Sequence, residues 1–385
     1  MRVAELPVRP LGYGALAVAI AAFITWSALG WVEFLYLAIG LLVCLLAAIG
    51  FTIGKQSYDV SLDIARLRVR VGESAFGKLQ VSNPTARRQF SAEITVPIGK
   101  NTVGVKVPGL APRAVFDEIF QIPTHKRAVI PLGPVCSARG DGLGLLSRQV
   151  QWVEVQDLFV HPQIVPIEGA AAGFVADLEG RATKEQSTSD VAFHALRDYE
   201  VGDDLRHIHW KTVARVGKLM VRQFDLTKRS HLVVALGMRP DEYADDDSFE
   251  LAVSVAASLA IQAIRDDHDL AVVTADRELH HETPTRLLDD CSALEFGGPS
   301  DPIALVARRA VQTAPDASMA ILVVGSKPTP TQMMQAIVPF GVDTRVLVIR
   351  CEPGLKVARR SIATTPVITL GDLADLPRAL RAVEL

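Results

Sequence analysis

Closely spaced cysteines are absent from this sequence of 385 residues. The four cysteines lie far apart and form no Cys-x-x-Cys pair: Cys44, Cys136, Cys291 and Cys351. That arrangement argues against a disulfide framework and against a zinc knuckle. Reduced thiols in a cytosolic environment are the simplest interpretation.

An excess of basic residues is also lacking. The chain has 40 Lys and Arg against 43 Asp and Glu, and its formal net charge is -3. Binding to the phosphates of nucleic acid requires a strong basic footprint. We therefore exclude nucleic acid as the main partner.

The familiar catalytic motifs are missing as well. The sequence contains no G-x-x-x-x-G-K-[ST] phosphate-binding loop and no G-x-S-x-G nucleophile elbow. His281 and Glu282 lack the second histidine that a zincin helix requires. We predict a protein that is not an enzyme and needs no cofactor.

Charge is missing from two long stretches near the N-terminus, residues 11–32 and 34–54, which are separated by Glu33 alone. Each stretch reaches the roughly 20 residues that a helix needs to cross a bilayer. Both are too long for the apolar core of a signal peptide. The sequence predicts a transmembrane helical hairpin in residues 1–56, with a buried pair of soluble helices as the alternative. Three aromatic residues lie where an interfacial belt is expected, Trp26, Trp31 and Tyr36.

The charges around this hairpin predict its orientation. Arg2 and Arg9 precede it, Lys55 follows it, and its turn carries only Glu33. Because positive residues favour the cytoplasmic side, both ends and the soluble domains are expected in the cytoplasm. The predicted location is the inner (plasma) membrane, crossed twice, with the lipid bilayer as one partner.

Residues 57–168 have a different character. Segments 67–71 and 77–81 alternate apolar and polar residues, as half-buried strands do. Turn signals such as Asn83-Pro84 separate such segments, and strand-like residues 153–155 and 158–160 end the region. We expect an antiparallel β-sandwich of the immunoglobulin-like class.

Strands and helices alternate in residues 226–385, after a small, polar linker at 169–196. Residues 231–237 form an apolar run typical of a strand buried on both faces. Asp247 and Glu250 resemble a capping box that opens a helix reaching about Asp266. Further strands are expected at 270–274, 319–325 and 344–350, with helices at 303–311, 331–338 and 373–382. This order predicts a doubly wound α/β domain with a parallel sheet.

Between the linker and this domain, residues 197–225 form a charged stretch with an abrupt change of sign. Its acids come first and its bases follow: Asp198, Glu200, Asp203 and Asp204, then Arg206, Lys211, Arg215, Lys218 and Arg222. Such a change suggests a surface that pairs with another part of the chain or with a partner. A solvated, charged connection is the alternative.

A metal site is the second interpretation of this stretch. On a strand, His207 and His209 would face the same side, and Asp203 or Asp204 would complete the ligand shell. The competing interpretation is that the imidazoles hydrogen-bond to nearby acids. A second acidic segment, DEYADDD at 241–247, follows the first strand of the α/β domain, and we interpret it as a solvated loop that favours the helix N-terminus.

The assembled residues resemble the domain-of-unknown-function-58 family of membrane-anchored bacterial proteins. The matching signature comprises Arg197, Tyr199, Gly202, Asp203, Asp204, Arg206, Ile208, His209, Trp210, Lys211, Ala214, Arg215, Gly217, Leu219, Val221, Arg222 and Phe224. Gln223 stands where the family usually has Glu. A weaker match lies upstream, at residues 141–145.

The resemblance implies a partner and a fold. Such proteins are associated with MoxR-type AAA+ ATPases that assemble or remodel other proteins, and they carry a von Willebrand factor A-like domain. The metal motif D-x-S-x-S of that superfamily is degenerate here, because Leu236, Gly237 and Met238 offer no acid or hydroxyl and Arg239 would repel a cation. Metal-dependent binding is therefore not expected.

Together these features predict a membrane-anchored scaffold that holds a β-sandwich and an α/β domain. Within the signature, we expect Asp203 and Asp204 to pair with bases, and Trp210 to anchor the segment by burial. Arg197, Arg206 and Arg215 are the candidates for bidentate bonds to carboxylates. A metal-dependent enzyme centred on Asp203, His207 and His209, and an envelope protein with a periplasmic partner, are the alternatives.

Overall fold

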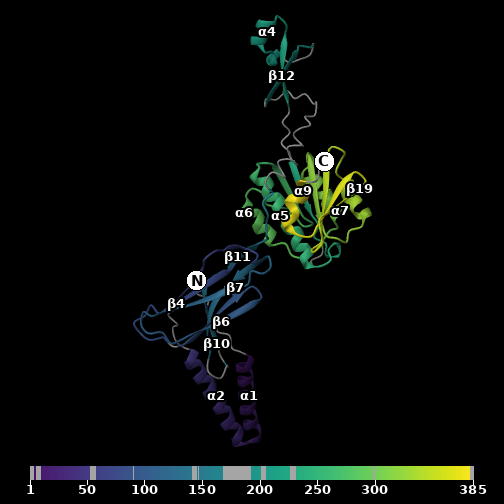
Figure 1. Cartoon of the computed structure of the whole chain (residues 1–385). Helices are drawn as coiled ribbons and strands as arrows, with labels where there is room; N and C mark the ends of the chain where they lie inside the picture. Colours follow the sequence, from purple (N-terminus) through teal and green to yellow (C-terminus); the bar gives the residue numbers. More distant parts are fainter. Residues whose placement is uncertain are drawn as a thin grey trace. The chain divides into compact units, whose positions relative to one another are not determined.

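The computed structural model describes residues 4–5, 10–52, 58–89, 91–140, 145, 147–167, 192–200, 205–225, 231–297 and 300–381. The chain divides into two compact units, Met1–His161 and Pro162–Leu385, each described here by itself. Figure 1 labels the elements. The upstream family match lies outside the described residues except for its last residue, Leu145.

Two apolar helices open the first unit, α1 (Pro10–Leu29) and α2 (Val32–Thr52). Gly30 joins them in a left-handed conformation with φ 71°, and its N–H donates to the Trp26 carbonyl at 2.8 Å. Both helices are long and apolar enough to cross a membrane. The residues buried along them are small, namely Gly12, Ala19, Ala22, Ala38 and Ala48, whereas many large apolar side chains face outward. This is the distribution that lipid requires.

The first unit also contains two sheets. One sheet has the order β2 (Asp59–Ile64), β4 (Ala75–Ser82) and β7 (Val115–Ile122). The other sheet runs β1 (Ala4–Glu5), β10 (Ser147–Val153), β9 (Val135–Gly140), β5 (Ala92–Ile98), β8 (Ala128–Leu132), β11 (Gln156–His161) and β3 (Arg68–Arg70), with β6 (Asn101–Val107) also paired to β5.

One hydrophobic core joins these two sheets. Leu79 and Ile122 come from the smaller sheet and pack in one cluster with Ile94, Leu132 and Leu158 of the larger one. Burial alternates along β4 from Ala75 onward, as the period-2 pattern predicted. A strand-rich region is confirmed, and its immunoglobulin-like class stays a prediction.

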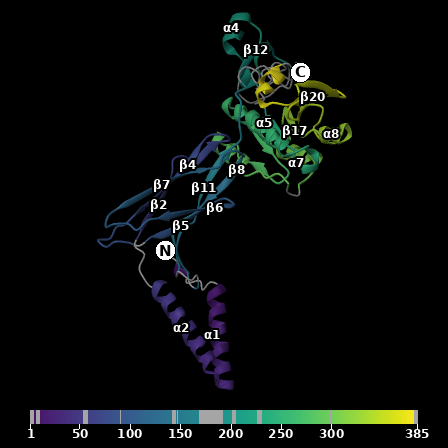
Figure 2. The ribbon, with the colours of Figure 1, turned by 60° about the horizontal axis from the view of Figure 1, so that its bottom comes forward.

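The second unit contains a mixed α/β sheet (Figure 2). Its strand order is β16 (Glu278–Leu279), β15 (Asp269–Val273), β14 (His231–Leu236), β17 (Met319–Val324), β18 (Arg345–Cys351), β20 (Thr365–Leu370) and β19 (Ala358–Ile362). The five inner strands pair in parallel, and the two edge strands pair antiparallel. The predicted alternation of buried strands with helices is confirmed.

Helices cover this sheet. They are α5 (Asp246–Arg265), α6 (Pro284–Ser292), α7 (Ile303–Thr313), α8 (Pro330–Ile337) and α9 (Leu376–Arg381). α5 packs against α6, and α7 packs against α8. α5 is also long and apolar enough to span a membrane, but 72% of its most apolar window is buried inside the unit. It is therefore a core helix, as its sequence pattern indicated.

The start of α5 corrects one prediction. The N-cap is Asp245, whose carboxylate accepts from the Ser248 N–H at 2.8 Å, so Asp247 and Glu250 do not form a capping box. Asp245 has the extended backbone that an N-cap needs (φ -156°, ψ 178°). Asp246 and Asp247 then lie in the first turn, where acids favour the helix dipole.

Candidate functional site

The charged stretch folds around a two-stranded antiparallel sheet of β12 (Ala192–Asp198) and β13 (Met220–Asp225). We call its described residues, 192–200 and 205–225, the signature module. Arg197 lies opposite Val221 in the register, and Ile208 forms an isolated bridge to Val221 from the other edge of β13. A lone hairpin is marginally stable, and this extra bridge adds a third segment. Ile208 and Val221 are each 5% exposed and form the buried centre of the module.

A short helix, α4 (Trp210–Val216), leads into β13. The His209 N–H donates to the Met220 carbonyl at 2.9 Å and fixes where the helix begins. Gly217 ends the helix in the left-handed region (φ 75°), and its N–H donates to the Val213 carbonyl. The glycine at position 217 is therefore explained by a C-cap conformation that other residues adopt with strain.

The predicted site residues fall into three groups. Tyr199, Arg206, His209, Lys211 and Arg215 lie on the surface or half-buried in the module. Arg197 and Arg222 lie on adjoining strands, and only their backbone is described. Gly202, Asp203 and Asp204 lie outside the described residues, so their pairing with bases stays a prediction.

The prediction that Trp210 anchors the segment by burial is wrong, because its side chain is 65% exposed. The interpretation of residues 205–210 as a strand is also wrong. Leu205–His207 is a 3-10 turn, and Trp210 is already helical. Alternation of faces does not apply to such a backbone. The buried centre is filled by Ile208 and Val221 instead.

The His-x-His pair is likewise not on a strand. The Nδ1 of His209 lies 2.6 Å from the Thr212 hydroxyl oxygen, within the first turn of α4. In the part of the chain that the structure describes, no group of three or more His, Cys, Asp or Glu residues is arranged to hold a metal ion. Asp203, the third member of the proposed metal centre, lies outside that part.

The second candidate region is the carboxyl edge of the parallel sheet. β14 lies between β15 on one side and β17 on the other. Later strands are therefore added to the sheet on the opposite side of β14 from β15. Open α/β sheets bind ligands at such a switch point. Here the space is filled by residues that follow β14, chiefly Glu242 and Tyr243, which are 6% and 1% exposed.

Hydrogen bonds hold these two residues in the crevice. One carboxylate oxygen of Glu242 accepts from the Ile303 N–H at 2.9 Å, at the first turn of α7. Its main-chain oxygen accepts from the Lys327 N–H at 3.1 Å. The Tyr243 hydroxyl donates to the Gly237 carbonyl, and its ring meets Phe249 edge-on at 5.4 Å. The residues that follow β14 are thereby bonded to the start of α7 and to the loop after β17.

The degenerate metal positions are part of this packing. Leu236, Gly237 and Met238 are buried, and the Gly237 N–H donates to the Val323 carbonyl at 2.9 Å. Arg239 pairs with Asp241 at 2.7 Å. Leu236, Gly237 and Met238 therefore pack the sheet edge, and their side chains offer no carboxylate or hydroxyl to a cation. The interpretation of residues 241–247 as a solvated loop is wrong for Glu242, because tertiary contacts bury it.

Burial raises the pKa of Glu242 above its usual value of 4.5, and the neighbouring Asp241 adds to the rise. The Ile303 N–H and Arg239 act in the opposite direction. The other carboxylate oxygen, Oε2, is buried without a hydrogen-bond partner among the described residues. Burial also raises the pKa of Tyr243, which keeps its hydroxyl a neutral donor.

Glu242→Gln should therefore remove a pH dependence of stability. In the wild type, the raised pKa stabilises the folded state fully below the unfolded-state pKa, near 4.5, and this contribution is lost as pH rises through the folded-state pKa. The variant should gain on the wild type in free energy of unfolding as pH increases from about 4.5 to 8. Urea unfolding of both proteins across this range measures the difference, and parallel pH profiles would contradict it.

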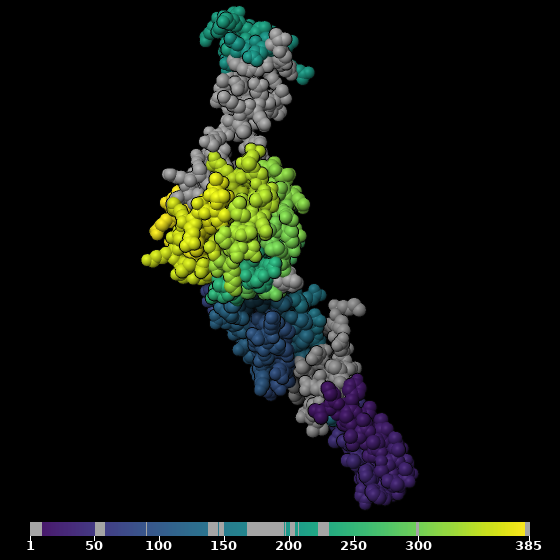
Figure 3. Space-filling model, turned by 90° about the vertical axis from the view of Figure 1, so that its right-hand side faces the viewer, coloured from purple at the N-terminus to yellow at the C-terminus, as the bar shows by residue number. Residues whose placement is uncertain are grey.

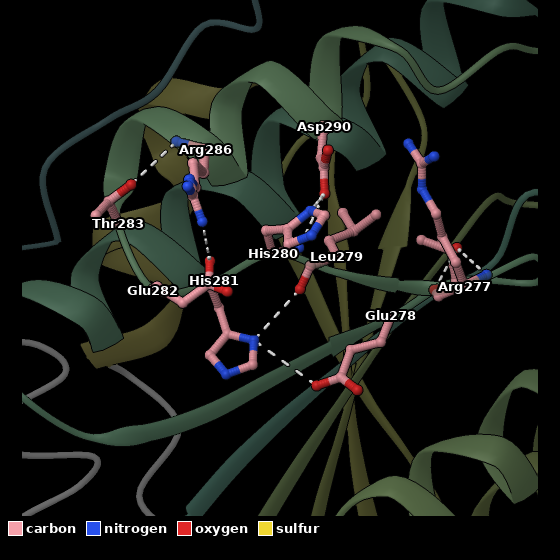
Figure 4. A network of polar contacts seen from close by, with 10 residues as sticks. Arg277, Glu278, Leu279, His280, His281, Glu282, Thr283, Arg286 and Asp290 are labelled. Atoms are coloured by element: carbon pink, nitrogen blue, oxygen red, sulfur yellow. Dashed lines mark hydrogen bonds and ion pairs between the residues drawn. The ribbon is translucent and has the colours of Figure 1, made fainter.

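A third polar cluster joins β16 to α6 (Figure 4). Asp290 accepts from the His280 N–H and lies against the His280 ring nitrogen Nδ1, both at 2.8 Å. The Nδ1 of His281 lies 3.3 Å from the Leu279 carbonyl and 3.7 Å from Glu278. The Asp290 contacts fasten the end of an edge strand to the helix that follows it. The sequence pattern did not indicate this contact, because it spans ten residues with no common periodicity.

Comparison with known proteins places the similarity on part of the chain. The family described as "Protein of unknown function DUF58" matches residues 195–289, from β12 to α6. The uncharacterized protein YeaD of Bacillus subtilis (strain 168) is 27% identical over 141 residues, which are 36% of this chain and 34% of that protein. This chain thus spans about a third of the length of that curated relative.

Two similar solved structures are distant likenesses. The CARDB domain of the PF1109 protein from Pyrococcus furiosus, solved with di-metal ions, covers 28% of this chain and 96% of its own, with 16% identity and a TM-score of 0.21. The C-terminal domain of wzt covers 29% and 77%, with 9% identity and a TM-score of 0.23. Scores this low assign no fold. The resemblance to the DUF58 family rests on the family match at residues 195–289, which include most of the signature module and the first part of the α/β sheet.

Proposed function

We propose that this chain is a non-enzymatic, membrane-anchored scaffold or adaptor that works with a MoxR-type AAA+ ATPase in assembling or remodelling proteins at the cell envelope. The observation that carries the proposal is the filled crevice at the carboxyl edge of the sheet. Glu242 and Tyr243 occupy the place where an open α/β sheet would hold a substrate or cofactor. Such a domain offers its outer surface to partners.

In this proposal the α/β domain is of the von Willebrand A type and has lost its metal motif at Gly237. The hairpin crosses the inner membrane twice and leaves both soluble domains in the cytoplasm. The basic residues Arg2, Arg9 and Lys55 flank the spans, whereas the turn carries Glu33, which supports that orientation. A cytoplasmic ATPase can then reach the signature module and the α/β domain.

Co-purification tests the proposal. The full-length chain, tagged and extracted from membranes in mild detergent, should retain an ATPase variant that binds ATP but cannot hydrolyse it. Retention should fall when nucleotide is omitted, because AAA+ partners bind in a nucleotide-dependent state. The control is an unrelated two-span membrane protein with the same tag.

Two results would contradict the proposal. One is equal recovery of the ATPase on the chain and on the control. The other is stoichiometric metal in the purified chain that is lost in His209→Ala, because this would favour the metal-dependent enzyme centred on Asp203, His207 and His209.

A further inference from the structure

Two loops of the first unit carry bases and no acid. They are residues 83–89, which follow β4, and residues 108–114, which precede β7. Their charged residues, all exposed, are Arg87, Arg88 and Arg113, which we call the arginine rim. Among the described residues, no member of the rim forms an ion pair. Exposed charges of one sign without a counter-ion create a surface that attracts anions.

A buried asparagine joins the two loops. Asn83 is 1% exposed, and its side-chain amide donates to the carbonyls of Arg87 at 2.8 Å and Ala111 at 3.0 Å. The Arg113 N–H in turn donates to the Asn83 carbonyl at 3.0 Å. The backbones that carry Arg87 and Arg113 therefore meet at one residue, which fixes where the rim lies.

The fold brings these like charges together without a visible gain in stability. Arg113 has a left-handed backbone with φ 60°, a region that residues with a large side chain rarely adopt. Arg88 lies across the second loop, because a β-carbon added to Gly109 would lie 3.8 Å from its Nε and 3.9 Å from its Nη2. Strain and like charges that the fold itself does not use point to a binding role.

The arginine rim lies at the end of the sheets where the chain arrives from the apolar helices. In the strand register, Ser82 at the end of β4 lies between Asp59 at the start of β2 and Val115 at the start of β7. From Thr52, which ends α2, the chain reaches no more than about 25 Å before β2 begins. Asp59 is separated from β7 by β4, and among the described residues it forms no ion pair with the rim.

A side-chain contact also links the hairpin to this end of the sheets. Leu145, between β9 and β10, packs with Ala48 of α2. Glu93, near the start of β5, lies opposite Ala138, near the end of β9, so the loop at 83–89 lies at the same end as Leu145. Figure 3 shows the two sheets, coloured blue, as one compact body, so this end is held by a folded core.

We infer that the arginine rim binds the anionic headgroups of the bilayer that the hairpin crosses. This inference rests on the membrane anchoring in the proposed function, and it does not depend on the ATPase. The phosphate and carboxylate groups of anionic lipids accept charge-assisted hydrogen bonds from guanidinium groups. The attraction acts only within about a Debye length of the surface, and the short connection to the hairpin keeps the rim near it. The hairpin brings lipid to this surface in every copy of the chain.

Hydrogen exchange of the full-length chain in nanodiscs tests the inference. The N–H groups of Gln89 and Arg113 each donate to a carbonyl of the opposite loop, at 2.9 and 3.0 Å, so they exchange only when the loops part. Bound headgroups hold the loops together. Nanodiscs of equal parts phosphatidylcholine and phosphatidylserine should therefore slow both amides about tenfold relative to phosphatidylcholine alone. Added salt should reduce this slowing.

A variant without the rim's charges should lose the slowing: Arg87→Gln, Arg88→Gln and Arg113→Gln. A matched control removes the same charge from exposed positions at the opposite end of the sheets, and it should respond to phosphatidylserine like the wild type: Arg66→Gln, Arg70→Gln and Lys100→Gln. Slow exchange at Leu79, in the core between the sheets, would show that each variant remains folded.

Four results would contradict the inference. Equal exchange in the two kinds of nanodisc would overturn it while the membrane anchoring stands. A chain that does not enter nanodiscs would overturn both. The same slowing by inorganic phosphate in phosphatidylcholine nanodiscs would show a site for free anions. Slowing that requires the ATPase would show a contact with protein instead of lipid.

Discussion

Gly325→Ala should strongly destabilise the α/β domain. A β-carbon at this position would lie 2.2 Å from the Glu242 carbonyl oxygen and 2.8 Å from the Tyr243 Cα. Both atoms belong to the backbone that fills the crevice, so no side-chain rotation relieves the clash. The loop would have to leave the crevice or the strand end would have to shift, at about 3 kcal/mol of unfolding free energy. The bond from the Lys327 N–H to Glu242 would be lost at the same time.

Hydrogen exchange measures this effect within the full-length chain. Amides of β14 and β17 exchange only when the sheet opens, so their protection should fall by about two orders of magnitude. Gly341→Ala is the matched control, because a β-carbon there meets no atom within 4 Å. Equal protection in the two variants would show that the crevice is not packed as described.

Arginine in the middle of both apolar helices should release the chain from the membrane. Ile20 and Val43 lie near the centres of α1 and α2 and face outward, with 53% and 57% of their surface exposed. An arginine at the centre of a spanning helix opposes insertion by about 2.5–3.5 kcal/mol on the insertion scale. The double variant Ile20→Arg and Val43→Arg should therefore lose most of its membrane-integrated fraction.

Resistance to alkaline extraction reports that fraction directly. Ile20→Leu with Val43→Leu alters the same positions without adding charge, and this control should remain integrated. A wild-type chain that alkali extracts completely would rule out a spanning hairpin. Full integration of the double arginine variant would do the same, because a spanning pair could not tolerate two central charges.

Much of the fold follows from local patterns in the sequence. The absence of charge over two stretches predicted the apolar helices, and alternation predicted β4 with its buried Leu79 and Val81. The apolar run at 231–237 predicted β14, which is buried except at His231. These patterns succeed because burial in a helix or a strand leaves a fixed period in the sequence.

The candidate site was harder to predict, since its geometry depends on distant contacts. Glu242 accepts a hydrogen bond from the Ile303 N–H, 61 residues away, and no local pattern indicates this contact. The acidic residues around it suggested a solvated loop instead. Trp210 was expected to anchor the segment by burial, but a 3-10 turn and a helix replace the assumed strand, and its side chain is exposed. Asp245, Asp246 and Asp247 are all residue types that favour an N-cap. Asp245 is the N-cap because its backbone is extended, whereas the other two are already helical.

The footprint of the ATPase on the signature module tests the central claim most directly. Hydrogen exchange is measured on the full-length chain in lipid nanodiscs that contain phosphatidylserine, with and without the ATP-locked ATPase. The account predicts that residues 208–219 become protected only when the ATPase is present, while strands β4 and β5 are unchanged. Exchange in 208–219 that is unaffected by the ATPase, or that is already slowed by the anionic nanodisc alone, would contradict it.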